Sequence, residues 1–263
     1  MAEETTVTVP SADGTKLTGY LYPTQAKGPN PAVVLMHGCG GMINKLGEPD
    51  KRNRTWAALF NAQGYTVLAL DSFGARGIKS QCAAADFDSS IYATRAKDAY
   101  GALLWLQARP DIAPNRIALM GWSQGGGVVL HTIAKNNPSR PATLPNGDFR
   151  AAVAFYPGSC SERWLGDWSP AIPLHVFQGE ADVWTPAAPC KAVMDDVAAK
   201  GAPVAMTIYP GAYHDFDWPG MKLHEAPAFR TKSGAVPIQG ENLDAEAAAH
   251  KAVPEFLAAR MGQ

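Results

Sequence analysis

The sequence predicts an α/β fold with a mainly parallel central sheet and helices on both of its faces. Two observations carry this prediction. Short apolar runs alternate with helical patterns through the middle of the chain, which is the order typical of a parallel sheet. The chain has 263 residues, 46% of them hydrophobic, so it can bury the core of one domain. We therefore expect residues 1–263 to form a single domain.

The individual elements follow from the spacing of apolar residues. Apolar runs, alternating or continuous, predict strands over residues 5–9, 17–22, 32–36, 66–70, 117–120, 151–155, 174–178 and 204–209. Apolar residues at helical spacing predict helices over residues 56–63, 93–107, 126–135, 187–200 and 244–259. The turn of residues 11–14 joins the first two strands into an antiparallel hairpin. Residues 42–54 and 215–241 are expected to be mostly loop, and Pro254 is a point where the last helix can kink.

Composition and charge exclude several classes of partner. The formal net charge is −1, and no run of Lys or Arg exceeds two residues, so nothing indicates binding to nucleic acid or to an anionic membrane. No apolar stretch approaches the length of a membrane span. We expect a small-molecule partner and either a monomer or a small homo-oligomer.

The cysteines bear on the compartment. Met1–Glu4 directly precede a strand and resemble a mature start with a methionine added, so the protein is either cytoplasmic or, if a leader was removed, periplasmic or secreted. The four cysteines lack the spacing of a zinc site. They are either free buried thiols or, in an exported protein, disulfides. Three pairings are open, and loops after neighbouring strands favour Cys39–Cys82 and Cys160–Cys190.

The sequence Gly121-Trp-Ser-Gln-Gly125 stands between the strand 117–120 and the helix 126–135. This order of strand, G-x-S-x-G and helix is typical of a nucleophile elbow, in which a tight turn exposes a serine hydroxyl at the edge of a sheet. Glycines on either side let strand and helix pass close to Ser123. The alternative is a glycine-rich turn with an ordinary serine.

A base and an acid are found after later strands. Asp182 follows the strand 174–178, and His214 follows the strand 204–209. Since the carboxyl ends of parallel strands meet at one edge of a sheet, both side chains are expected near Ser123. The chain order Ser123, Asp182, His214 is the order of the α/β-hydrolase arrangement. We predict a triad in which Asp182 orients His214 and His214 activates Ser123.

Other residues compete for the same roles. Glu180, Asp215 and Asp217 are rival acids, although Glu180 is suited to holding its own turn. Packing, structural or surface roles are expected for His37, His131, His175 and His250, whereas His224 lies in the long loop and is a candidate for contact with the substrate. The oxyanion hole is predicted to consist of the backbone N–H groups of Gln124 and Cys39, one after the nucleophile and one in the loop after the strand 32–36.

Several motifs together resemble the dienelactone hydrolase family of α/β-hydrolases. They are Gly-Trp-Ser123-Gln-Gly, Gly-Glu-Ala-Asp182, Gly-Ala-Tyr-His214-Asp-Phe-Asp, His37-Gly-Cys-Gly-Gly and the segment Asp71–Gly77. The resemblance implies ester or lactone hydrolysis without a cofactor or metal, with Ser123, Asp182 and His214 as the triad. Two differences from the namesake enzymes stand out. Their nucleophile is a cysteine, and a glutamate occupies the position of His37.

Several other side chains are candidates for contact with the substrate. Arg76 either pairs with a substrate carboxylate or binds backbone carbonyls of its own loop. Trp122, Trp184 and Trp218, together with Trp164, are expected to roof an open site. Only 18 residues, 156–173, separate the strands between which lipases insert a lid, so no large lid is expected. This favours small soluble acyl groups over long chains.

Two other functions remain open from the sequence. A peptidase or an acyltransferase can use the same triad on the same fold, because the triad does not select the leaving group. A non-catalytic binding protein is the second class of alternative.

Overall fold

The computed structural model describes residues 4–83, 85 and 87–262; Met1–Glu3, where the sequence suggests a start left by a removed leader, lie outside them. The main strands are β1 (Thr5–Pro10), β2 (Lys16–Tyr22), β3 (Asn30–Met36), β4 (Thr66–Asp71), β5 (Ile112–Trp122), β6 (Ala151–Phe155), β7 (Leu174–Gly179) and β8 (Val204–Tyr209). The helices are α1 (Lys51–Asn61), α2 (Ile91–Gln107), α3 (Gln124–Thr132), α4 (Glu162–Leu165), α5 (Ala187–Ala199) and α6 (Leu243–Met261). Short elements complete the list: η1 (Gly74–Arg76), β9 (His224–Glu225), η2 (Pro227–Phe229) and β10 (Ile238–Gln239).

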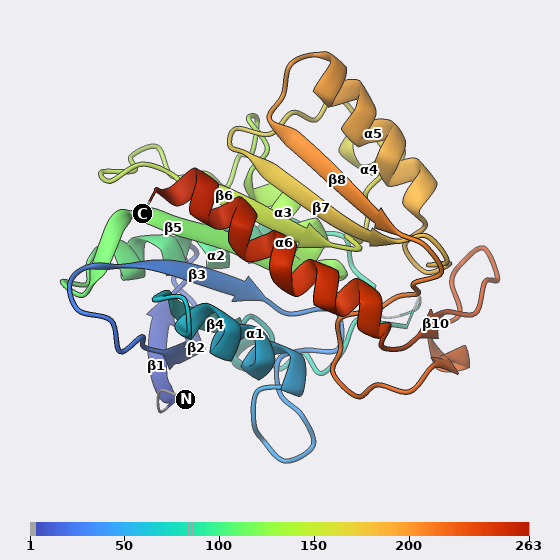
Figure 1. Cartoon of the computed structure of the whole chain (residues 1–263), viewed down its shortest axis with the longest axis horizontal. Coiled ribbons are helices and arrows are strands. Elements are labelled where there is room, and N and C mark those ends of the chain that lie inside the picture. Colours follow the sequence, from blue (N-terminus) through green and yellow to red (C-terminus); the bar gives the residue numbers. More distant parts are fainter. Residues whose placement is uncertain (1–3, 84, 86, 263) are drawn as a thin grey trace.

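The eight main strands form one sheet in the order β1-β2-β4-β3-β5-β6-β7-β8. From β4 to β8 in this order all neighbours are parallel, while β1 and β2 form an antiparallel hairpin whose β2 pairs antiparallel with β4. Helices cover both faces of the sheet, and α1 and α6 lie together in front of it in Figure 1. The predicted α/β-hydrolase fold is therefore confirmed.

The alternation of side chains along the strands separates the core into two halves. Val33 and Leu35 of β3 pack in the half closed by α1 and α6, whereas Val34 and Met36 pack in the half closed by α2, α3 and α5. Successive side chains of a strand point to opposite faces, so a strand with helices on both sides must be apolar throughout. All seven residues of β3 are buried, as this arrangement requires.

The structure differs from the sequence prediction at two segments near the sheet edge. Helix α1 begins at Lys51 rather than at residue 56, because the Asp50 side chain caps it by accepting from the Asn53 N–H at 2.9 Å. The predicted loop 215–241 contains the small β9–β10 hairpin, and Gln239 forms a bridge with His214. This segment is therefore part of the wall around the carboxyl ends of the strands.

Across residues 4–83, 85 and 87–262, no helix combines the length and the apolar character that crossing a membrane requires.

Candidate active site

Ser123 lies in the turn between β5 and α3, with φ 53° and ψ −117°. This conformation is strained for a residue with a side chain. The turn depends on its glycines: a Cβ on Gly121 would overlap the Gly125 carbonyl, and a Cβ on Gly125 would overlap the Met36 carbonyl. The close approach of three backbone segments thus places the Ser123 hydroxyl at the carboxyl edge of the sheet, where the side chain is largely enclosed.

Asp182 and His214 follow the neighbouring strands β7 and β8 and meet at this edge. The Nδ1 atom of His214 lies 2.7 Å from Oδ2 of Asp182. The same carboxylate accepts the N–H groups of Trp184 and Thr185 at 2.8 and 3.0 Å, and the Thr185 hydroxyl at 2.7 Å. With Gln178 Nε2, which donates to Oδ2 at 3.4 Å, four donors besides the imidazole hold the Asp182 carboxylate in place.

The electrostatic environment of His214 favours its protonated form. Burial alone would lower the pKa of His214, but the negative charge of Asp182 and the hydrogen bond to it outweigh burial and raise that pKa above its usual value of 6.5. An imidazole stabilised in this way can hold a proton taken from a hydroxyl. Ser123 and His214 line the same cavity of about 400 Å³, together with Trp184 and Trp218.

The two segments expected to hold an oxyanion both lie next to Ser123. Cys39 and Gln124 both line a second cavity that also reaches Ser123. Among the hydrogen bonds of the described residues, none is donated by the backbone N–H of Cys39 or of Gln124. Gln124 is the first residue of α3, where backbone N–H groups have no partner inside the helix. Both amides are thus available to a ligand at the serine.

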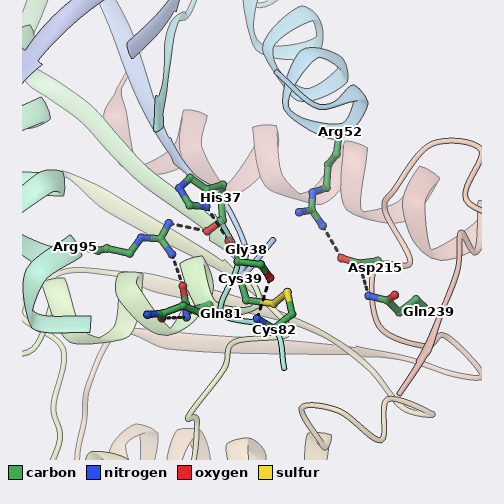
Figure 2. Close-up of a disulfide and its surroundings, with 11 residues drawn as sticks. His37, Gly38, Cys39, Arg52, Gln81, Cys82, Arg95, Asp215 and Gln239 are labelled. Carbon is green, nitrogen blue, oxygen red and sulfur yellow. Dashed lines mark hydrogen bonds and ion pairs between the residues drawn. A yellow bond between two sulfur atoms is a disulfide. The ribbon is translucent and has the colours of Figure 1, made fainter. Parts of the chain in front are cut away.

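A buried arginine ties these two segments together. Arg95 of α2 donates to the His37 carbonyl at 2.6 Å and to Oε1 of Gln124 at 2.9 Å. The side chain of Gln124 donates in turn to Gln81, whose N–H donates to the Cys39 carbonyl at 2.9 Å. Figure 2 shows Arg95 pointing at the loop of His37 and Cys39. Burial lowers the pKa of Arg95 to about 10, so the guanidinium stays charged at neutral pH.

A second buried arginine, Arg52, lies across the loop of His37 and Cys39 from Arg95 in Figure 2 and lines the cavity that contains His214. Arg52 of α1 donates to Asp215 and to the Tyr156 hydroxyl, both at 2.7 Å, and Gln239 donates to the other oxygen of Asp215 at 2.8 Å (Figure 2). Its guanidinium also lies 4.4 Å from the centre of the Trp218 ring. Sequence reasoning missed Arg52 because it placed residues 42–54 in a loop. The sequence signal for an earlier helix start was Asp50, because aspartate is a preferred residue at the N-cap of a helix.

Two of the possible substrate contacts, Trp122 and Arg76, do not line either cavity at Ser123, and Arg76 instead takes up the alternative of bonding within the protein. Trp122 is fully buried, and its indole N–H donates to Asp217 at 2.7 Å, because the alternation along β5 turns it toward the α1 and α6 side of the sheet. Arg76 is held by both oxygens of Asp98 at 2.7 and 2.9 Å, by Asp13 at 3.0 Å and by the Ser72 carbonyl at 2.8 Å. Neither side chain faces a cavity at Ser123.

The other expected residues near the site have well-defined places. Trp184 and Trp218 line the cavity that contains His214, and the Trp184 ring lies 4.8 Å from the imidazole. His37 is fully buried; its Nδ1 donates to the Gly38 carbonyl at 2.7 Å and its Nε2 accepts from Ser72 at 3.2 Å. His37 therefore holds two loops together.

The rival acids are engaged elsewhere. Glu180 accepts the Gly211 N–H at 3.2 Å, so it connects the turn after β7 to the turn after β8. Asp217 accepts from Trp56, Trp122 and Tyr156 within the core. Among the described residues, no group of three or more His, Cys, Asp or Glu side chains is placed to hold a metal ion.

The four cysteines form two disulfides in the pairing that the sequence favours. Cys39 is bonded to Cys82 next to Ser123 (Figure 2), and Cys160 is bonded to Cys190. The first bridge lines both cavities at the serine, so it anchors the loop that contains the Cys39 amide.

Known proteins resemble this chain in sequence and in fold. The sequence model of the dienelactone hydrolase family matches residues 17–260. An uncharacterized protein of Mycobacterium tuberculosis is 27% identical over 221 residues, covering 80% of this chain and 72% of its own. A dienelactone hydrolase-like promiscuous phosphotriesterase from metagenomic libraries superposes with a TM-score of 0.70 at 21% identity, covering 98% of each chain. Esterase 2 of Thermogutta terrifontis, phosphorylated by paraoxon, superposes with a TM-score of 0.67 at 21% identity over 97% of this chain and 94% of its own.

Proposed function

Because the chain belongs to the dienelactone hydrolase family, we propose that it is a serine hydrolase that cleaves small carboxylic esters or lactones through an acyl-enzyme. The observation that carries this proposal is the joint placement of three groups. A strained serine at the elbow and a histidine hydrogen-bonded to a buried aspartate line one cavity, while two free backbone amides flank the serine. Acyl transfer needs this set of groups.

In the proposed mechanism the Ser123 oxygen attacks the ester carbonyl while His214 takes the hydroxyl proton. Asp182 orients the imidazole and stabilises its charged form, and the N–H groups of Gln124 and Cys39 bind the oxyanion. His214 then gives the proton to the leaving oxygen, so the alcohol departs and the acyl group stays on Ser123. A water molecule, activated by His214, attacks the acyl-enzyme and releases the acid.

A peptidase or an acyltransferase would use the same residues, and a binding protein would need none of them. The esterases among the structural neighbours support ester hydrolysis over these alternatives. The phosphorylated forms of the Thermogutta esterase also give a precedent for trapping such a site with an organophosphorus reagent.

The test compares wild-type protein with Ser123→Ala, and uses Ser139→Ala as a matched control at a half-buried serine outside the site. Wild type should hydrolyse p-nitrophenyl acetate and bind one equivalent of a fluorophosphonate at Ser123. Ser123→Ala should lose both properties and remain folded, with a fall in kcat of about 10⁴-fold or more. Full hydrolysis by Ser123→Ala would show that another group is the nucleophile.

We also infer that the protein works in an oxidising compartment, either the periplasm or outside the cell. The two disulfides support this inference, because cytosolic thiol systems keep cysteines reduced. Alkylation of the unreduced, denatured protein, purified from its native compartment, should find no free thiol. Four free thiols would contradict the inference.

A further inference from the structure

Two separate cavities meet at Ser123. The Tyr92 cavity, of about 290 Å³, is lined by Phe87, Tyr92, Trp164, Trp184 and Phe229. The His214 cavity, of about 400 Å³, is lined by His214, Arg52, Asp215, Trp218 and Met221. Five residues line both cavities: Cys39, Cys82, Ser123, Trp184 and Phe229. A substrate whose carbonyl carbon is bonded to Ser123 therefore has two directions in which its two halves can extend.

The position of the base decides which half extends in which direction. His214 must reach the leaving oxygen to protonate it, and this histidine lines the His214 cavity and not the Tyr92 cavity. The leaving alcohol therefore starts in the His214 cavity. The acyl group, which stays on Ser123 after the alcohol departs, is left with the Tyr92 cavity, where Gln124 also lies.

The Tyr92 cavity has a wall of aromatic rings from distant parts of the chain. Phe87 makes edge contacts with Tyr92 and with Trp164, at centroid distances of 6.1 and 6.2 Å. Trp184 and Phe229 stack on each other at 5.4 Å where the two cavities meet, whereas Phe87, Tyr92 and Trp164 line the Tyr92 cavity and not the His214 cavity. Aromatic rings attract one another in such offset and edge geometries by more than the burial of their area. A flat ring entering this cavity would gain contacts of both kinds.

The size of the cavity limits the acyl group further. A volume of about 290 Å³ is near the lower limit of ligand pockets, which hold roughly 300 to 1,000 Å³. One ring on a short linker fits this space, and a long alkyl chain does not. Tyr92 and Ser159 both line this cavity, and their hydroxyl groups are bonded to each other at 2.9 Å.

We propose that the preferred substrates are esters of arylalkanoic acids, with the aromatic ring of the acyl group in the Tyr92 cavity and the alcohol in the His214 cavity. This proposal rests on the proposed serine hydrolase function, because the orientation follows from the role of His214.

A pair of isomeric esters tests the orientation. Methyl phenylacetate carries its ring on the acyl side and benzyl acetate on the alcohol side, while both leave as simple primary alkoxides. We expect kcat/KM to be about tenfold or more higher for methyl phenylacetate, since one well-filled apolar site discriminates by that order. Methyl cyclohexylacetate, which has an aliphatic ring of similar size, should be poorer than methyl phenylacetate. A preference for benzyl acetate would overturn the orientation, and equal rates for the two ring types would overturn the aromatic assignment.

A variant connects the preference to the cavity. Trp164 is 46% exposed, so Trp164→Leu should fold normally. It should lower the ratio of kcat/KM for methyl phenylacetate to that for methyl acetate severalfold. Trp105→Leu, at a partly buried tryptophan on α2 outside both cavities, is the matched control and should keep the wild-type ratio. An unchanged ratio in Trp164→Leu would overturn the proposal.

Hydrolysis of p-nitrophenyl acetate distinguishes a failure of the substrate assignment from a failure of the proposed serine hydrolase function. If wild type cleaves it in a Ser123-dependent reaction but shows no preference for the arylacetyl ester, the substrate assignment fails and the serine hydrolase stands. If no ester is cleaved, both fail.

Discussion

His214 is the residue on which burial and charge act most directly against each other. Its pKa is raised because Asp182 outweighs the effect of burial. General-base catalysis needs the neutral imidazole, so the active fraction falls as pH drops through this raised pKa. We expect kcat/KM for p-nitrophenyl acetate to decline on the acid side with a midpoint above 6.5, measured as a pH–rate profile.

Two variants of the loop after β7 test whether His214 is the group that titrates at this midpoint. Asp182→Asn should lower kcat by about 10⁴-fold and shift the midpoint to lower pH, because the carboxylate that stabilises the imidazolium is gone. Glu180→Gln makes the same chemical change two residues away, at a carboxylate bonded to Gly211, and should leave the profile unchanged. If the acid-side midpoint of the pH–rate profile were unchanged in Asp182→Asn, a group other than His214 would be the one that titrates.

Arg95 illustrates positioning by a residue outside the cavities. Its two hydrogen bonds join the loop of Cys39 to the start of α3, so they set the distance between the two amides expected to bind the oxyanion. Arg95→Lys keeps a charge but cannot make both bonds in the same geometry. We expect kcat to fall on the order of 10²-fold with KM little changed, as for a small displacement of reacting groups.

The control for this prediction is Arg109→Lys, at a partly exposed arginine paired with Asp111 beyond the end of α2. It should leave kcat at the wild-type value. Thermal unfolding of both variants separates a loss of fold from a loss of alignment. A rise in KM with kcat unchanged in Arg95→Lys would instead indicate that this arginine acts on substrate binding.

At the residue scale, sequence reasoning succeeded where chemistry is tied to a strand end and failed where it depends on side-chain direction. Asp182 and His214 could be placed because each directly follows a parallel strand. Trp122 adjoins Ser123 in sequence, yet its side chain points into the core and donates to Asp217. Arg76 pairs with Asp98 of α2, a helix that begins 15 residues after Arg76 in the chain. Arg95 reaches the site because α2 packs beside it, and the local sequence around Arg95 contains no pattern that predicts this packing.

At the element scale, the disulfides hold loops that no regular structure fixes. Cys160–Cys190 connects the segment after β6 to α5 across 30 residues, and Cys39–Cys82 closes 43 residues beside the serine. Removal of the first bridge in Cys160→Ser/Cys190→Ser should lower the free energy of unfolding by roughly 3 to 4 kcal/mol through the entropy of the freed chain. Urea unfolding would measure this loss.

The second bridge supplies the comparison. Cys39→Ser/Cys82→Ser should lose a similar amount of stability, and it should also lower kcat, because the loop that contains the Cys39 amide is no longer tied at the site. Cys160→Ser/Cys190→Ser should keep most of its kcat. Equal losses of kcat in the two double variants would argue that stability alone, and not the position of Cys39, explains the effect.

The elements themselves were predictable where apolar spacing is regular and not where a cap sets the boundary. The inner strands β3, β4 and β6 were placed within a few residues because they are fully buried and mostly apolar. The exception is β5, which starts at Ile112 rather than at residue 117, because polar residues interrupt its apolar pattern. The β9–β10 hairpin has two residues per strand, too few for any periodicity to show.

At the scale of the whole molecule, the absence of a large cap decides what can reach the serine. Between β6 and β7 the chain contributes only the four-residue helix α4, and the walls around Ser123 come instead from loops of several parts of the chain, including the segment of β9 and η2. Such loops enclose two compact cavities of about 290 and 400 Å³. They provide no amphipathic helix to rest on a lipid surface.

We therefore expect p-nitrophenyl acetate and butyrate to be cleaved with higher kcat/KM than p-nitrophenyl palmitate. A short acyl group fills the Tyr92 cavity, whereas most methylenes of a palmitoyl chain would remain in water and gain no burial. All three esters share one leaving group, so the comparison isolates the acyl chain. Rates followed as a short-chain ester passes its solubility limit should level off without a jump, because no lid opens at an interface. A higher kcat/KM for palmitate, or a jump at the solubility limit, would mean that the site opens further than its two cavities show.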